Sequence, residues 1–212
     1  MFKTDPYHNN DNAKQYDKWF EENRWVYDAE VRAVGSLFVP AQRSIEVGAG
    51  TGRFAAPLGI KTGIEPSGSM RNIAQKRGVA VLGGVAEELP FRDAAVELVL
   101  MVTVICFVND IYKTFKESFR VLSKGGSVIV GMIDRNTPLG QMYLENKHDS
   151  LFYKQATFRS VDEILEIMEQ TGFDDFSFRQ TIFQDLSEIS ENEMVRTGYG
   201  DGLFAVIRGR KK

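Results

Sequence analysis

The chain has little cysteine, little histidine and no excess of positive charge, and each shortage excludes a class of protein. The single cysteine, Cys106, permits neither an internal disulfide nor a cysteine-based zinc site. No cluster of His, Asp and Glu has the spacing of metal ligands, so we expect no metal centre. The net charge of −3 leaves no basic excess to neutralise phosphates, which argues against a partner made of nucleic acid.

Long apolar runs and a leader-like start are also missing. No apolar stretch approaches the length that spans a membrane, and the first residues lack the charged-then-apolar pattern of a signal peptide. We therefore expect a cytoplasmic protein with no membrane partner. Cys106 lies in the apolar segment 102–108, which favours a buried small side chain over a nucleophile.

The length of 212 residues and the 43% of apolar residues fit one domain with a sizeable core, spanning 1–212. Aromatic and aliphatic residues recur at helical spacing over 1–39, which predicts an N-terminal helical arm. From residue 40 to 135 short apolar strands alternate with helices. The predicted strands are 44–47, 60–64, 79–82, 96–104 and 127–133, and the predicted helices are the stretch through Phe54 and Leu58, 68–77 and 111–122.

The last part, 136–212, does not continue the regular alternation of strand and helix. Residues 136–158 are irregular and aromatic, 161–170 are predicted as a helix, and 176–183 and 203–208 as two final strands. Repeated alternation of strand and helix predicts an α/β fold, doubly wound, with a mostly parallel seven-stranded sheet and helices on both faces.

A glycine-rich turn follows the first predicted strand, with the sequence E-V-G-A-G-T-G over 46–52. In doubly wound sheets ligands bind beyond the carboxyl ends of the strands, and glycines let the backbone approach a ligand closely. The dinucleotide pattern G-x-G-x-x-G needs glycine at position 53, where this chain has Arg53, and the phosphate-loop ending G-K-[ST] is absent. The turn thus disfavours a dinucleotide or a nucleoside triphosphate as the ligand.

An acidic residue ends the second predicted strand, in the segment G-I-E-P-S over 63–67. A carboxylate in this position can accept hydrogen bonds from both hydroxyls of a ribose. Glu65 lies 17 residues after Gly48, close to the spacing that such sites use. The pairing of acid and glycine turn indicates a nucleoside-containing ligand.

Two further segments complete a recognisable set: A-E-E-L-P-F over 86–91 and R-V-L-S-K-G-G over 120–126. Together with the glycine turn and Glu65, they resemble the class I S-adenosylmethionine (SAM)-dependent methyltransferases of the type 11 domain family. The resemblance is strongest over 40–135. It implies that the cofactor is SAM and that the cofactor-binding residues are Glu46, Gly48, Ala49, Gly50, Gly52, Glu65, Pro66, Ser67, Met70, Ala86, Glu87, Met101 and Thr103.

The resemblance also implies how this set divides along the cofactor. The three glycines would border the methionine half of SAM, with Glu46 near its ammonium group, and Glu65 would hold the ribose. Met70, Ala86 and Glu87 would surround the adenine, while Met101 and Thr103 would lie near the methyl donor. Val85 departs from the family, which usually has an acid at that position.

The methyl acceptor is less defined by the sequence, and no catalytic residue can be named. We expect a small soluble metabolite, with a lean towards an amine, because aromatic rings attract cationic products. The candidate substrate-side residues are Tyr7, Tyr16, Trp19 and Tyr143, and the acids Glu145 and Asp149 lie near the last of these in sequence. Two rival classes stay open: a non-catalytic SAM-binding regulator or partner subunit, and an NAD(P)-dependent oxidoreductase.

Overall fold

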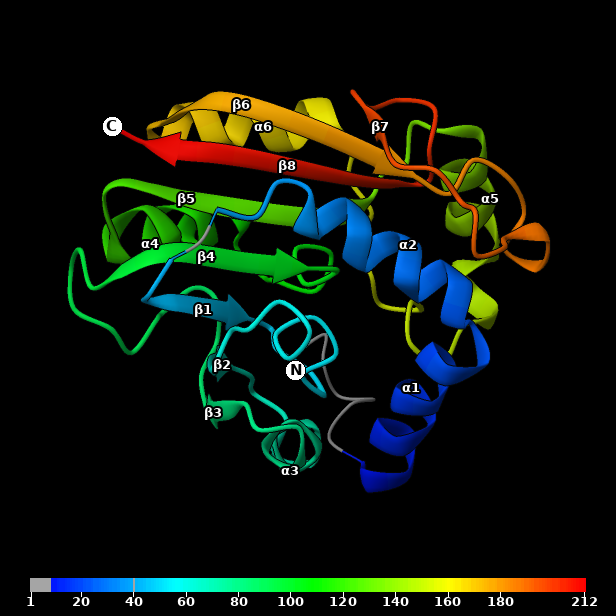
Figure 1. Ribbon diagram of the computed structural model, residues 1–212, viewed down its shortest axis with the longest axis horizontal. Coiled ribbons are helices and arrows are strands. Elements are labelled where there is room, and N and C mark those ends of the chain that lie inside the picture. Colours follow the sequence, from blue (N-terminus) through cyan, green and yellow to red (C-terminus); the bar gives the residue numbers. More distant parts are fainter. Residues whose placement is uncertain (1–8, 40) are drawn as a thin grey trace.

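The computed structural model describes residues 9–39 and 41–212. Its centre is an eight-stranded sheet with the order β3-β2-β1-β4-β5-β8-β6-β7 (Figure 1). The strands are β1 (Ser44–Val47), β2 (Thr62–Ile64), β3 (Ala80–Leu82), β4 (Val96–Val102), β5 (Leu122–Ile133), β6 (Phe173–Thr181), β7 (Arg196–Thr197) and β8 (Phe204–Lys211).

The sheet is parallel over its first five strands and antiparallel towards the other edge. β1 pairs in parallel with β2 and β4, β3 with β2, and β5 with β4. β8 then inserts antiparallel between β5 and β6. The strand order turns back at β1 and β4, so a crevice forms beyond the carboxyl ends of these two strands. The doubly wound α/β prediction is confirmed.

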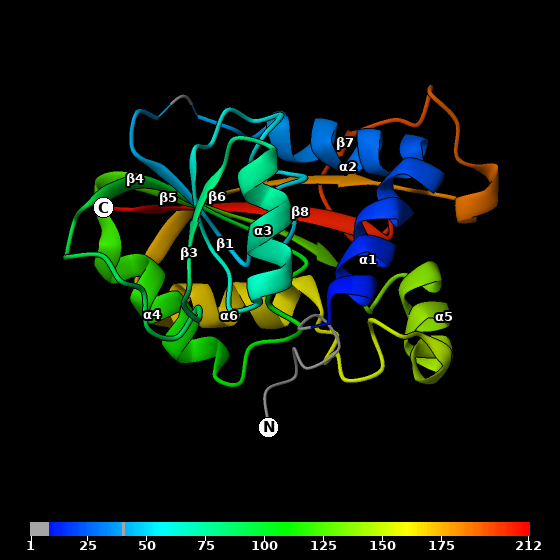
Figure 2. The same ribbon diagram turned by 90° about the horizontal axis from the view of Figure 1, so that it is seen from below.

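Helices cover both faces of the sheet (Figure 2). α4 (Ile111–Val121) and α6 (Val161–Thr171) pack on one face, against alternate strand residues such as Val99 and Val130. α2 (Arg24–Gly35) and α3 (Gly68–Lys76) contribute to the core on the other face, which contains Leu98 and Leu100. Both faces of β4 are therefore buried, as its continuous apolar run predicts.

The N-terminal arm comprises α1 (Asn10–Glu22) and α2, which lie beside the carboxyl ends of β1 and β4 (Figure 1). Asn9 caps α1 by accepting the N–H of Asp11 at 2.8 Å. Asp17 of α1 forms ion pairs with Arg53 at 2.9 Å and Arg77 at 2.6 Å, which fasten the arm to the core. Along 9–39 and 41–212, no helix has the length and apolar character needed to cross a membrane.

Three details differ from the sequence-based expectation. The sheet has eight strands because the two-residue β7 adds to the edge of β6. Residues 51–59 form turns where a helix was predicted. The N–H of Ala55 donates to the side chain of Glu46 at 2.8 Å, and Pro57 has no N–H to donate. The helical hydrogen bonds from Ala56 to Gly52 and from Leu58 to Phe54 are therefore isolated, and no continuous ladder forms.

The third difference concerns 136–158, which is not irregular throughout. It contains α5 (Pro138–Asn146) and the short 3₁₀ helix η2 (Lys147–Asp149). Thr137 caps α5 by accepting the N–H of Gly140 at 3.1 Å, and Pro138 occupies the first turn, where a missing N–H is harmless. A second 3₁₀ helix, η3 (Leu186–Glu188), follows β6.

Candidate functional site

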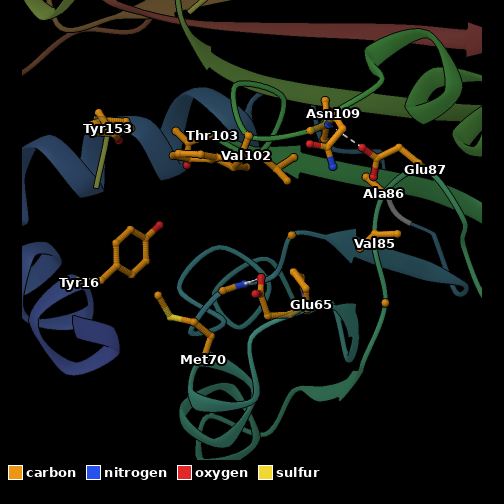
Figure 3. A pocket seen from close by; sticks show the side chains of 17 residues that line it. Tyr16, Glu65, Met70, Val85, Ala86, Glu87, Val102, Thr103, Asn109 and Tyr153 are labelled. Atoms are coloured by element: carbon orange, nitrogen blue, oxygen red, sulfur yellow. Dashed lines mark hydrogen bonds between the residues drawn. The ribbon is translucent and has the colours of Figure 1, made fainter. Parts of the chain in front are cut away.

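A cavity of about 100 Å³ opens beyond the carboxyl ends of β1 and β4 (Figure 3). The glycine turn and the end of β2 form one side, the residues after β3 another, and the loop after β4 a third. Of the cofactor-binding set predicted from the sequence, the residues that line it are Gly48, Gly50, Glu65, Pro66, Met70, Ala86, Glu87 and Thr103. Other lining residues are Tyr16, Gly84, Val85, Val102, Val104, Phe107, Val108, Asn109 and Tyr153.

The glycine turn uses its glycines for two different purposes. Gly48 has a φ of +70°, and a Cβ added there would lie 2.3 Å from Cγ2 of Val104, so the chain itself leaves no room for a side chain. Gly50 has a φ of +53°, but a Cβ there would meet its nearest neighbour, Tyr16, only at 3.8 Å. Gly48 is thus required by close packing, whereas Gly50 leaves space in the cavity.

Glu65 joins the turn to the start of α3. Its Oε2 accepts the N–H of Gly50 at 3.1 Å and its Oε1 accepts the N–H of Ser67 at 2.8 Å. Burial raises the pKa of the Glu65 carboxyl, although both backbone N–H groups and the charge of Arg71 act in the opposite direction. Arg71 also donates to the backbone carbonyls of Glu65 and Pro66, at 2.7 and 2.8 Å. The carboxylate is therefore held in one orientation at the cavity wall.

Five members of the predicted set lie behind the cavity wall. Ser67 caps α3 by accepting the N–H of Met70 at 3.2 Å, and a Cβ on Gly52 would lie 3.3 Å from Ala74 of the same helix. Met101 is fully buried on the α4 and α6 face of β4. The other two buried members are Ala49 and Glu46.

Glu46 is buried beneath the glycine turn, where its Oε2 accepts the N–H of Ala55. Burial and the neighbouring charge of Glu65 raise the pKa of the Glu46 carboxyl well above its ordinary value, although the Ala55 N–H opposes the shift. The placement of Glu46 near the ammonium group of SAM stays a prediction from the family resemblance.

The far end of the cavity is formed by the segment after β3 and the loop after β4. Glu87 connects them, because its Oε1 accepts the N–H groups of Asn109 at 2.7 Å and Asp110 at 3.3 Å (Figure 3). Val85 and Ala86 line the same end. The polar side chains of this end are those of Glu87 and Asn109, and Val85, Ala86 and Val108 make the rest of it apolar.

A second cavity, of about 300 Å³, adjoins the first and shares three lining residues with it: Tyr16, Thr103 and Tyr153. Trp19 and Phe20 of α1 and Tyr143 of α5 contribute further rings to its wall. The structure therefore brings three of the four predicted substrate-side residues together, and Tyr7 lies outside the described residues. The remaining lining residues are Val26, Glu30, Phe54, Ile133, Asn146, Lys147, Ser150, Phe152, Ile182, Leu186 and Leu203.

The junction of the two cavities is formed by polar groups and by strained backbone. The Tyr16 hydroxyl makes a hydrogen bond with the side chain of Thr103, and its ring points towards the carboxyl end of β4 (Figure 3). Thr103 has a φ of +52° and Ile182, in the second cavity, a φ of +67°. β-branched residues rarely adopt this backbone region, and such strain concentrates at functional sites.

Sequence reasoning missed the two charged residues of this wall, Lys147 and the acidic Glu30 of α2. The signal was present in the spacing, since Glu30 follows Val26 by four residues and precedes Val34 by four, which places it on the apolar face of the helix. The two acids proposed from the sequence for the substrate side, Glu145 and Asp149, are not among the residues described in this wall. Glu145 is exposed and lines neither cavity, and the side chain of Asp149 lies outside the described part of the structure.

Other candidate reactive groups have structural roles. Asp134 is buried and its Oδ1 accepts the N–H of Asn136 at 3.0 Å, which stabilises the turn before α5. The Cys106 thiol is buried and donates to the carbonyl of Thr103 at 3.2 Å. His148 is exposed, and His8 lies outside the described residues. Within 9–39 and 41–212, no three His, Cys, Asp or Glu residues are grouped as metal ligands.

Comparison with known proteins gives a consistent result. The family model described as a methyltransferase domain matches residues 45–130. An uncharacterized protein of Methanocaldococcus jannaschii is 42% identical over 199 residues, covering 94% of this chain and 96% of its own length. A ubiquinone/menaquinone biosynthesis C-methyltransferase of Vibrio cholerae is 27% identical over 206 residues, covering 81% of this chain and 72% of its own length.

Among solved structures, a protein of Thermotoga maritima is 49% identical, with a TM-score of 0.91 and coverage of 94% of this chain and 95% of its own. Its name reads "SAM-dependent methyltransferase, possible histamine N-methyltransferase". The doubly wound fold, with a glycine turn and a strand-end acid at one cavity, defines a nucleoside-binding α/β protein. The chain belongs to the family of SAM-dependent methyltransferases.

Family membership makes the chain an enzyme with SAM as its cofactor, and it decides against an NAD(P)-dependent oxidoreductase. The first cavity fits this cofactor. A side chain at Gly50 would enter it, its polar wall residue Glu65 can accept hydroxyl groups, and its far end is mostly apolar, as a purine requires.

Proposed function

We propose that this enzyme transfers the methyl group of SAM to a nitrogen atom of a small soluble amine. The observation that carries the proposal is the second cavity, whose aromatic wall adjoins the first cavity at Tyr16, Thr103 and Tyr153. Aromatic faces attract organic cations, and a methylated amine is such a cation when protonated. The name of the 49% identical Thermotoga maritima protein supports nitrogen as the acceptor atom.

The residues of the first cavity receive specific roles in this proposal. Glu65 accepts the two ribose hydroxyls through lone pairs that its bonds to Gly50 and Ser67 leave free. The backbone at Gly48 and Gly50 borders the methionine half of the cofactor.

The other end of the first cavity provides the residues that contact the adenine in this proposal. Met70 packs against one face of the adenine, and the backbone of Ala86 contacts its edge. Glu87 already accepts two backbone N–H groups through one oxygen, so its other oxygen is the candidate acceptor for the adenine amino group.

The chemistry requires little covalent participation from the chain. When SAM is bound, its sulfonium would supply an activated methyl group. A nitrogen–carbon bond would form while the carbon–sulfur bond breaks, the electron pair of that bond would go to sulfur, and the nitrogen would lose its proton to water. Tyr16, Thr103 and Tyr153 contribute by positioning the acceptor at the junction and by excluding water.

The size and composition of the second cavity support a small acceptor. A volume of about 300 Å³ suits a small metabolite, and the net charge of −3 does not favour a nucleic-acid substrate. The test is release of S-adenosylhomocysteine from SAM across a panel of small amines, phenols and carboxylic acids. We expect turnover with amines, and turnover confined to phenols or acids would reject the proposal.

A further inference from the structure

Glu30 is a buried carboxylate with no hydrogen-bond or ion-pair partner among the described residues. The residue is 8% exposed, and its place is the wall of the second cavity. Within 9–39 and 41–212, no hydrogen bond or ion pair reaches its side chain. Removal of an ionised carboxylate from water is costly unless a cation or hydrogen-bond donors replace the water. A carboxylate that faces a cavity lined mainly by aromatic and aliphatic side chains is therefore complementary to a positively charged ligand.

The groups that surround the cavity do not neutralise Glu30. Tyr16 of α1 and Tyr143 of α5 are close enough for the charge of Glu30 to raise the pKa of both phenols further, after the main effect of their own burial. Tyr153 is a third phenol in the wall. The cationic group of the wall, Lys147, directs its Nζ to the carbonyl of Ala156 at 3.0 Å.

Desolvation has a direct consequence for the proton of Glu30. Burial raises the pKa of its carboxyl to about 8, so the empty cavity holds a neutral acid at pH 7. A cation that binds beside it favours the ionised form and displaces the proton. Ligand binding and proton release are then linked.

We propose that Glu30 binds a protonated nitrogen of the methyl acceptor in the second cavity, an inference that rests on the proposed N-methyltransferase function. A nitrogen paired with the carboxylate retains its proton and has no lone pair for attack. The nitrogen that receives the methyl group must then be a second, neutral one at the junction of the cavities. The acceptor class is accordingly a small compound with two basic nitrogens, one cationic and one neutral at working pH.

Isothermal titration calorimetry on the full chain, with S-adenosylhomocysteine present, tests this assignment. Histamine carries an ammonium group and an imidazole, and 4-(2-hydroxyethyl)imidazole replaces the ammonium with a neutral hydroxyl. Glu30→Gln keeps the size of the side chain and removes the charge. We expect the histamine dissociation constant to rise about 10- to 100-fold in Glu30→Gln, and that of the alcohol to change little.

Proton linkage gives a second readout. At pH 7, in buffers of different ionisation enthalpy, histamine binding should release close to one proton from the wild type and none from Glu30→Gln. Glu145→Gln, which removes an exposed charge of α5 outside both cavities, should behave as the wild type. Unchanged affinity for S-adenosylhomocysteine in every variant establishes that the cofactor cavity is intact.

The outcomes separate the inference from the function on which it rests. Equal histamine affinity in wild type and Glu30→Gln, equal weakening of both probes, or no binding of histamine to the wild type would each overturn the role of Glu30. Methylation of amines that persists in Glu30→Gln with unchanged KM would leave the proposed function intact and reject the inference. Selective histamine binding without methyl transfer would retain the inference as a binding site and reject the function.

Discussion

Replacement of Glu30 by glutamine should stabilise the folded protein at alkaline pH. In the unfolded chain a glutamate titrates near its ordinary pKa of about 4.5, whereas burial raises the pKa of Glu30 in the folded state to about 8. The folded state therefore binds one more proton between these values, and stability falls as pH rises through this window. At about 1.4 kcal/mol per pH unit, the upper limit of the loss is about 5 kcal/mol.

Water that enters the cavity hydrates the carboxylate and reduces this loss, so we expect about 2–4 kcal/mol. The assay is urea unfolding of wild type and Glu30→Gln at intervals from pH 4 to pH 9. The difference between the two free energies of unfolding removes the contribution of every other titrating group. It should be near zero at pH 4 and should favour the variant by about 2–4 kcal/mol at pH 9. A difference independent of pH would refute the reasoning.

Three more predictions concern the cofactor cavity and the arm. Gly50→Ala should weaken SAM binding at least tenfold in calorimetry. The control is Gly59→Ala, which should leave the affinity unchanged, because Gly59 has a similarly positive φ and an added Cβ would meet no atom within 4 Å. Equal affinities of the two variants would mean that Gly50 does not face the cofactor. Glu65→Ala should reduce SAM binding by about 1.5–3 kcal/mol in a folded protein, and unchanged binding would remove its ribose role. Asp17→Ala should speed amide hydrogen exchange in α1 by breaking the ion pairs to Arg53 and Arg77, and unchanged exchange would show that they do not hold the arm.

Most of the sheet could be predicted from the sequence. The apolar runs mark the strands, and the glycines and turn residues between them mark where strands and helices end. The apolar run of β4 and the helix end at Gly172 both reflect local rules. The turn at 51–59 could not be predicted in the same way. Its backbone follows a hydrogen bond from Ala55 to Glu46, which joins residues nine positions apart, and no local pattern indicates such a bond.

The residues of the site were predictable where a sequence motif fixes the backbone. They were less predictable where the packing of side chains determines which residues line a cavity. The glycine turn and Glu65 lie at the cavity as their sequence pattern indicates. Met101 and Thr103 are two residues apart, but the left-handed backbone of Thr103 at the end of β4 breaks the strand alternation, so only Thr103 reaches the cavity. The spacing of Glu30 places it on the apolar face of α2, but only the packing of α5 and of the segment 150–153 makes that position the wall of a cavity.

The measurement that most directly tests the account is the fate of a deuterated methyl group. SAM labelled in its methyl group is incubated with the full chain and histamine, and in parallel with each other compound of the panel. The products are fragmented by mass spectrometry to locate the label. We expect the labelled methyl group on a nitrogen of histamine, formed together with S-adenosylhomocysteine. Label recovered on carbon or oxygen of another panel compound, with histamine left unmodified, would contradict it.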